Sequence, residues 1–344
     1  MKTFSPCWIE NTPNCQPYPW HPSVVYLERP FGGHRYWMAQ TPVPPFEIQP
    51  YIDRYELPCI HYSDDGLNWK ALASNPIDDL TDDQIEEHDY FSDPHLVLKD
   101  GVLECYYRLT LLKDKQLADN KTLLCKKTST DGQNWSERVV VADLRLPTDV
   151  EVWGEQIISP ALVNKDGVYK CWYVDASGYV KGRHVRVSES ADGVKWSTNS
   201  VCTLKGVNVD PWHIDVQYYE GCYYMIVYEN NRLSLYVSDD NGKTFEFVRE
   251  ILRASNNAYD FYCDGLYRAC SVKTGEGYKI YFSARRKEKT YFGCLLTKDW
   301  ESYRGVSGQP VLRFLRKDIF PDMTRKEWTR PIKWRIKRTL GKKA

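Results

Sequence analysis

Ser63-Asp64-Asp65-Gly66-Leu67-Asn68-Trp69 is the first copy of a pattern that recurs through this chain of 344 residues. Later copies begin at Ser129, Ser190 and Ser238, and a shortened fifth copy begins at Thr297. The pattern suits a hairpin turn of the Asp-box kind, because the aspartate bonds nearby backbone amides and the glycine accepts a positive φ. Copies spaced 49 to 66 residues apart in strand-rich sequence predict the blades of a β-propeller.

A second hairpin precedes each copy. Asp100-Gly101, Asp166-Gly167 and Glu220-Gly221 each separate two apolar runs, which is a strong hairpin signal. The first unit turns at Gly32-Gly33 and the fifth at Gly275–Gly277. We therefore predict an all-β fold, a five-bladed β-propeller with four-stranded antiparallel blades. One short helix is expected near residues 80–87.

The domain prediction is a propeller over residues 1–310 and a basic C-terminal tail over 311–344. From Arg313 to Ala344 there are 12 Lys and Arg against 3 Asp and Glu, with Trp328 and Trp334 interleaved. Such a tail could contact an anionic membrane, dock on the acidic ring, or stay in solvent. The sequence has no apolar run of about 20 residues and no signal-like start, so we expect a cytoplasmic protein, with the inner membrane face as an option.

The amino-acid composition narrows the classes of cofactor, metal and partner that we expect. The 11 cysteines lack CxxC spacing and suit reduced thiols in a core. We expect no cofactor and no metal, although two histidines and several carboxylates in one mouth could hold an ion. No basic face for nucleic acid is visible outside the tail, and a monomer is expected.

Aligning the blades by their turns gathers polar residues at one mouth of the central channel. Each inner strand starts there and each second strand returns there, which also places Glu56 and aromatic side chains nearby. We expect this mouth to bind the ligand, and the predicted substrate-binding residues are Trp20, Arg108, Asp175, Trp212, His213, Asp215, Glu229 and Arg285.

The chain resembles the five-bladed β-propeller glycosidase superfamily that includes glycoside hydrolase families 43 and 32. The resemblance covers most of residues 15–305. It rests on three segments: Trp20–Val25 with Tyr36–Ala39, Tyr55–Ile60 leading into the first turn, and Ser92–His95.

The resemblance implies carboxylate catalysis at the mouth. Asp93 matches the aspartate that opens blade two in that superfamily, and Glu155 lies near the position of the general acid. His21 stands where the blade-one aspartate would act as base or nucleophile. We therefore predict a glycoside hydrolase or transglycosidase with Asp93, Glu155, His21 and Glu56 as catalytic residues, His21 and Glu56 being alternatives as base. The alternative is a propeller that binds or assembles glycans without catalysis.

Overall fold

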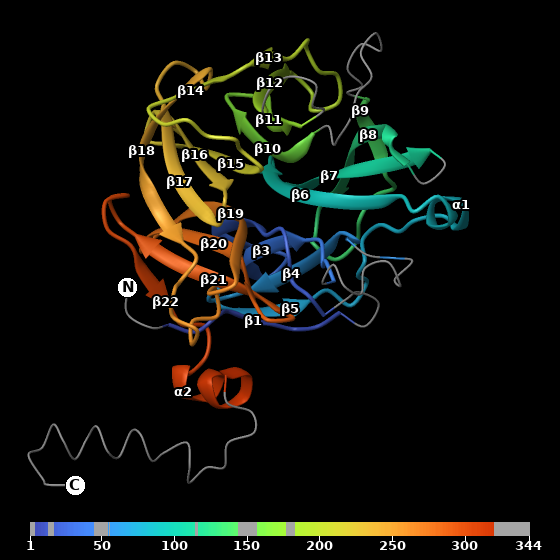
Figure 1. The fold of residues 1–344 in the computed structure, drawn as a ribbon. Helices are drawn as coiled ribbons and strands as arrows, with labels where there is room; N and C mark the ends of the chain where they lie inside the picture. The colour runs from blue at the N-terminus through green and yellow to red at the C-terminus, as the bar shows by residue number, and fades with distance from the viewer. Residues whose placement is uncertain are drawn as a thin grey trace, which may run out of the picture.

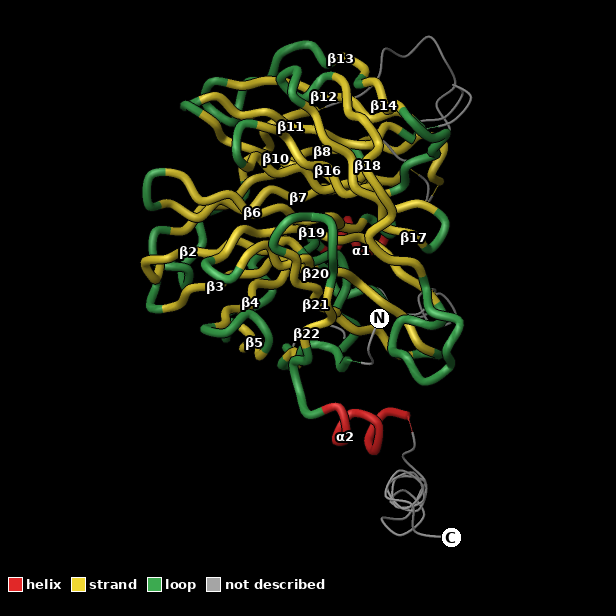
Figure 2. The backbone as a smooth tube through the Cα atoms, turned by 90° about the vertical axis from the view of Figure 1, so that its left-hand side faces the viewer, coloured by secondary structure: helices red, strands yellow, loops and turns green. Residues whose placement is uncertain are grey.

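The computed structural model describes residues 4–12, 17–44, 54, 56–113, 116–143, 157–176 and 183–319. Within these ranges the strands form five sheets of four or five strands, arranged as a ring (Figure 1). The predicted five-bladed β-propeller is therefore confirmed. Short strands added at the outer edges give two blades a fifth strand. Figure 2 shows the ring from the side, with α2 (Val311–Phe314) below the sheets.

Each blade is a contiguous stretch of chain, and the edge strands β1 and β14 pair parallel to β5 and β18. Blade one contains β1 (Trp8–Ile9), β2 (Ser23–Phe31), β3 (His34–Gln40), β4 (Cys59–Ser63) and β5 (Asn68–Ala71). Blade two contains β6 (Tyr90–Lys99), β7 (Val102–Lys113), β8 (Gln116–Ser129) and β9 (Val139–Asp143). Blade three contains β10 (Ile158–Lys165), β11 (Val168–Asp175), β12 (His184–Ser190) and β13 (Ser200–Val201). Blade four contains β14 (Thr203–Lys205), β15 (His213–Tyr219), β16 (Cys222–Glu229), β17 (Arg232–Ser238) and β18 (Thr244–Arg253). Blade five contains β19 (Gly265–Thr274), β20 (Gly277–Arg286), β21 (Lys289–Thr297) and β22 (Arg304–Val306).

The inner hairpins follow the predicted turns. Lys99 pairs with Val102 across Asp100-Gly101, and Tyr219 pairs with Cys222 across Glu220-Gly221. The expected short helix is α1 (Asp82–Glu86), which Thr81 caps with its side chain. A second helical segment, α2 with the π-turn Leu315–Ile319, follows the last blade.

The repeated turns hold neighbouring blades together. Asp131 Oδ1 accepts hydrogen bonds from the amides of Gln133 and Asn134, both at 2.8 Å. Gly132 in the same turn has a φ of 78°, and a Cβ there would lie 2.1 Å from the indole of Trp37 in blade one. Only glycine therefore lets this turn pack against the adjacent blade.

The hydrophobic core is divided among the blade interfaces. Five clusters of buried residues each join two neighbouring blades, and the cluster with Val24, Met38, Cys270 and Cys294 joins blade one to blade five. The ring is therefore closed by side-chain packing. The ten cysteines of the described chain are all free thiols.

The predicted basic tail lies largely outside the described residues, which end at Ile319. Phe314 is buried against the core of blades four and five, so the start of this region packs on the propeller. In the described chain, neither helix has the length or apolar character needed to cross a bilayer.

Candidate functional site

Three inner strands are irregular where they enter the channel. The ladders of β6, β10 and β19 each shift register near their first residues. Asp93 and Ser159 lie in two of these bulges with φ values of 52° and 51°, and Tyr267 and Arg268 lie in the third. A bulge turns a side chain away from the regular alternation, and strained backbone of this kind clusters at functional sites.

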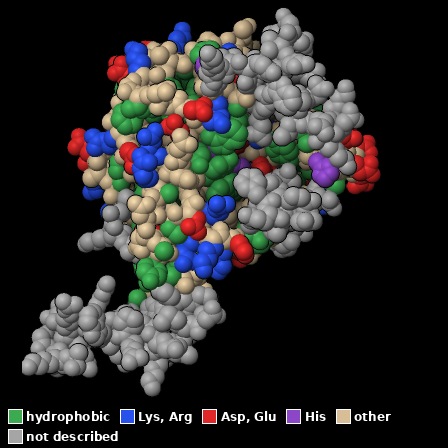
Figure 3. Space-filling model, in the orientation of Figure 1, with side chains coloured by type: hydrophobic (Ala, Val, Ile, Leu, Met, Phe, Trp, Pro, Cys, Tyr) green, Lys and Arg blue, Asp and Glu red, His purple; other side chains and the backbone are tan. Residues whose placement is uncertain are grey.

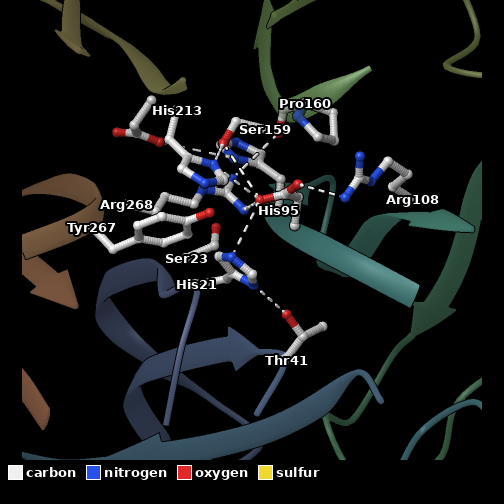
Figure 4. Close-up of polar contacts among 12 residues, drawn as sticks. His21, Ser23, Thr41, His95, Arg108, Ser159, Pro160, His213, Tyr267 and Arg268 are labelled. Atoms are coloured by element: carbon white, nitrogen blue, oxygen red, sulfur yellow. Dashed lines mark hydrogen bonds and ion pairs between the residues drawn. The ribbon is translucent and has the colours of Figure 1, made fainter. Parts of the chain in front are cut away.

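His21, Asp93 and His213, which we call the cluster, converge at the channel mouth, and Figure 4 shows the two histidines. His21 Nε2 lies 3.9 Å from Asp93 Oδ1, and His213 Nδ1 lies 3.3 Å from the same oxygen. One ligand atom from each residue can be chosen so that all three lie within 4.8 Å of one another. All three side chains are buried. The predicted grouping of these three residues is thus present in the structure.

Hydroxyl groups orient the two imidazoles. His21 Nδ1 and Thr41 Oγ1 are 2.7 Å apart, so the Nε2 side of His21 faces the cluster. Ser159 Oγ lies 2.5 Å from His213 Nδ1 and 3.5 Å from Asp93 Oδ1. These contacts restrict the rotation of both rings.

Two buried guanidinium groups flank Asp93. Arg268 Nη1 lies 3.5 Å from Oδ1, and Arg108 Nη2 lies 3.6 Å from Oδ2. Burial by itself would raise the pKa of Asp93, but His21, His213 and Arg108 outweigh it and hold that pKa well below its usual range. Burial lowers the pKa of both His21 and His213. At neutral pH the cluster therefore contains two neutral imidazoles and one carboxylate.

This donor set fits a divalent transition-metal ion. The atoms that converge are His21 Nε2 and His213 Nδ1, which lie 3.9 and 3.3 Å from Asp93 Oδ1; His21 Nε2 is buried without a hydrogen bond, and His213 Nδ1 is 2.5 Å from Ser159 Oγ. Separations of 3.3 and 3.9 Å suit ligands that share an ion at about 2.0–2.2 Å. Neutral imidazole and carboxylate are the ligand forms that such ions require. Sequence spacing could not reveal this, because the three residues come from three blades.

Glu56 stands beside His21. Its Oε2 lies 3.9 Å from His21 Nδ1, and the residue is 8% exposed with a φ of 56°. The amide of Glu56 donates to the carbonyl of Pro42 at 2.9 Å, which fixes the backbone there. A carboxylate thus adjoins the cluster, as predicted.

A second polar layer lies further along the same strands. Asp215 is two residues beyond His213 on β15, so it points to the same face but deeper in the channel. Its Oδ2 accepts from the amide of Ser271 at 3.0 Å, and its Oδ1 lies 3.8 Å from His95 Nδ1. Burial raises the pKa of Asp215 to about 6. Asp215 therefore lines the channel at a deeper level than His21, Asp93 and His213.

The remaining predicted residues lie in different surroundings. Asp175 pairs with Arg186 at 2.6 Å, and Glu229 pairs with Arg232 at 2.6 Å, so neighbouring arginines engage both carboxylates. Trp20 and Trp212 each lie edge-on to a cluster histidine. Arg285 is half-buried, and Glu155 lies outside the described residues. Figure 3 shows hydrophobic side chains beside a hollow in which histidine and acidic groups are visible.

Sequence analysis overlooked Arg268, Ser159, Thr41 and Tyr267 as site residues. A signal for Arg268 exists, because it stands seven residues before the hairpin turn of its blade. Asp93, Ser159 and His213 stand at that same spacing in blades two, three and four, whose turns begin at Asp100, Asp166 and Glu220, as the turn of blade five begins at Gly275. Thr41 and Tyr267 carry no comparable signal.

No family model matches the chain. Among curated proteins, the A type blood N-acetyl-α-D-galactosamine deacetylase of Flavonifractor plautii is 28% identical over 233 residues. The match covers 58% of this chain and 29% of that protein. The chain thus spans less than a third of the length of this relative.

Several solved structures resemble the chain. An N-acetylgalactosamine deacetylase from F. plautii, in complex with blood group B trisaccharide, gives a TM-score of 0.66 at 18% identity and covers 94% of this chain and 98% of that chain. A xylan β-1,4-xylosidase from Bacillus halodurans gives 0.61 at 17% identity, covering 88% and 58%. A glycoside hydrolase family 43 protein from Bacillus licheniformis gives 0.57 at 14% identity, covering 85% and 55%. The chain therefore has the fold of the five-bladed β-propeller glycosidase superfamily, and the resemblance predicted from its sequence is confirmed at that level.

Proposed function

We propose that this protein is a metal-dependent hydrolase that removes an N-acetyl group from an amino sugar of a glycan at the channel mouth. The observation that carries the proposal is the convergence of His21, Asp93 and His213, two neutral imidazoles and one ionised carboxylate. A bound divalent ion would polarise the amide carbonyl and acidify a water molecule. His21, Asp93 and His213 would hold it.

The chain's own residues have separate tasks in this reaction. Glu56 takes a proton from the attacking water, and the water oxygen adds to the amide carbon. The C–N bond then breaks as Glu56 returns the proton to nitrogen, leaving acetate and a free amine. Arg108 and Arg268 keep the surroundings of Asp93 positive, which favours the negative charge that develops on the carbonyl oxygen. Thr41 holds His21 in one orientation.

The comparisons support the substrate class. The F. plautii protein is named an N-acetyl-α-D-galactosamine deacetylase, and the matching solved structure holds a blood group trisaccharide. A deacetylase on this fold accounts for His21 at the position where the glycosidase base would stand. A deacetylase also agrees with the ionised state of Asp93.

Glycoside hydrolysis is the second candidate. Asp93 and Glu56 are two buried carboxylates that approach opposite nitrogens of His21, each at 3.9 Å. Paired carboxylates across a sugar are what that reaction needs. A glycan-binding propeller without catalysis is the third outcome that the same experiment distinguishes.

The deciding experiment incubates the full chain with oligosaccharides ending in N-acetylgalactosamine or N-acetylglucosamine, and measures released acetate and new reducing ends separately. We expect acetate release that EDTA abolishes and Zn²⁺ or Mn²⁺ restores. Glu56→Gln should lower kcat by about 10²–10⁴-fold while Zn²⁺ binding persists. Glu220→Gln, in an exposed pair on the hairpin turn of blade four, is the control.

Reducing ends without acetate would replace the proposal with glycoside hydrolysis. Glycan binding without either product would replace it with a binding function. Acetate release that survives removal of all metal would overturn the role of the cluster.

A further inference from the structure

An aromatic wall runs from the rim of the mouth to the cluster. Trp20 stacks on Tyr267 with ring centroids 5.0 Å apart and planes 23° from parallel. Trp212 Nε1 donates to the Tyr267 hydroxyl at 2.6 Å. The ring of Tyr267 in turn lies 4.2 Å from that of His213 and 5.5 Å from that of His21. The wall therefore contacts both histidines directly.

This wall is held in place although two of its rings lie outside the core. Trp20 and Tyr267 belong to none of the five hydrophobic clusters among the described residues. The amide of Trp20 donates to Gln40 Oε1 at 3.1 Å, and its carbonyl accepts from the amide of Thr41 at 3.2 Å. Half-buried aromatic rings fixed in this way beside a polar cluster are typical of ligand sites rather than of packing.

Only one ring of the wall is suited to receive a ligand. Tyr267 is enclosed by Trp20 on one side and His213 on the other. Trp212 has the Arg183 guanidinium 4.4 Å from its ring centre and packs on the core of blades three and four. Trp20 stacks on Tyr267, and the described residues include no second ring stacked on Trp20 and no cation placed over its indole.

We infer that the outer face of Trp20 is the platform on which the pyranose ring carrying the acetamido group stacks, an inference that rests on the proposed function. The C–H groups of a pyranose form an apolar face that packs on an indole, while the hydroxyls stay in water. The ring of Trp20 is 6.4 Å from that of His21, so the platform adjoins a residue of the cluster. Tyr267 contacts both Trp20 and the two histidines. It therefore couples the position of the sugar ring to the position of the reacting group.

The test measures binding by calorimetry in a Glu56→Gln background, with N-acetylgalactosamine as the probe. We expect Trp20→Ala to weaken binding about 10- to 100-fold, and Trp20→Phe to weaken it less, because a smaller aromatic face is retained. Trp8→Ala is the matched control, since Trp8 is an exposed tryptophan on the outer strand β1. Equal binding by the Trp20→Ala protein and its parent, or equal weakening by Trp8→Ala, would overturn the inference.

A ring-free probe separates stacking from damage to the cluster. N-acetylethanolamine carries the acetamido group but no pyranose, so Trp20→Ala in the otherwise unaltered chain should raise KM for the sugar by a larger factor than it raises KM for N-acetylethanolamine. If Trp20→Ala impairs both probes equally, Trp20 supports the fold of the site and the inference fails. If no substrate loses acetate yet the sugar still binds through Trp20, the proposed function fails and the platform stands.

Discussion

Replacing Asp93 by asparagine tests whether this carboxylate is the counter-charge of two buried guanidinium groups. Arg268 and Arg108 approach its two oxygens at 3.5 and 3.6 Å, with side chains at most 4% exposed. At these distances each attraction is about 5 kcal/mol for an effective dielectric constant of ~20. Desolvation cancels part of this gain, but asparagine would remove the negative charge that faces both buried cations. We therefore expect Asp93→Asn to lower the free energy of unfolding by about 3–5 kcal/mol.

The assay is urea unfolding of EDTA-treated protein at pH 7, followed by tryptophan fluorescence. Urea is uncharged and does not screen the pairs, unlike guanidinium chloride. The double variant Asp93→Asn with Arg268→Met removes one buried cation together with its partner. It should therefore lose less stability than the two single variants combined. Glu220→Gln, which breaks an exposed pair with Lys273, should change little.

Two results would refute this reasoning. Asp93→Asn could unfold within about 1 kcal/mol of the parent, which would mean that the guanidinium groups find other compensation. The two single effects could also add without coupling, which would mean that Asp93 and Arg268 act independently.

Three further predictions concern residues that stabilise the site or the fold. Thr41→Val should weaken Zn²⁺ binding about 10-fold or more in calorimetry, with thermal stability nearly unchanged, because the hydroxyl only orients His21. Gly132→Ala should destabilise the protein more than Gly101→Ala in urea unfolding, since both have a φ of 78° but only the Cβ at Gly132 meets another blade; equal losses would contradict this packing. Burial lowers the pKa of His61 to about 4, so the unfolded chain takes up a proton first as the pH falls below 6.5. Stability should then fall by up to about 3 kcal/mol between pH 6.5 and 4, with a shallower slope in His61→Gln; an unchanged slope would show that His61 is not the group responsible.

The architecture was predictable because its signals are local. The repeated turns at Asp65 and Asp131 and the Asp-Gly pairs of the inner hairpins each act within a few residues, and the backbone bonds of Asp131 are those expected from sequence. Their spacing then requires five blades. The fifth strands of blades one and four were not predicted, because β1 and β14 are only two and three residues long and their partner strands lie far away in the sequence.

The site was predicted only in part, because its geometry depends on bulges. Aligning the blades correctly brought His21, Asp93 and His213 to one mouth. Strand alternation could not place Arg268, whose β-bulge disrupts the regular pattern. From blade five it is Arg268 that contacts Asp93, while substrate binding by Arg285 stays a prediction.

The residue seven places before each hairpin turn determines the chemistry at this mouth. Blades two to five place Asp93, Ser159, His213 and Arg268 there, and only one of these is a carboxylate. A glycosidase needs a protonated acid, and Asp93 cannot serve as one while its pKa lies well below the usual range. Burial lowers the pKa of both His21 and His213, and the neutral imidazole that results is the form that binds a metal ion. The same scaffold that in the resembled enzymes aligns carboxylates here aligns imidazoles, and this difference in side chains favours metal-dependent hydrolysis over carboxylate catalysis.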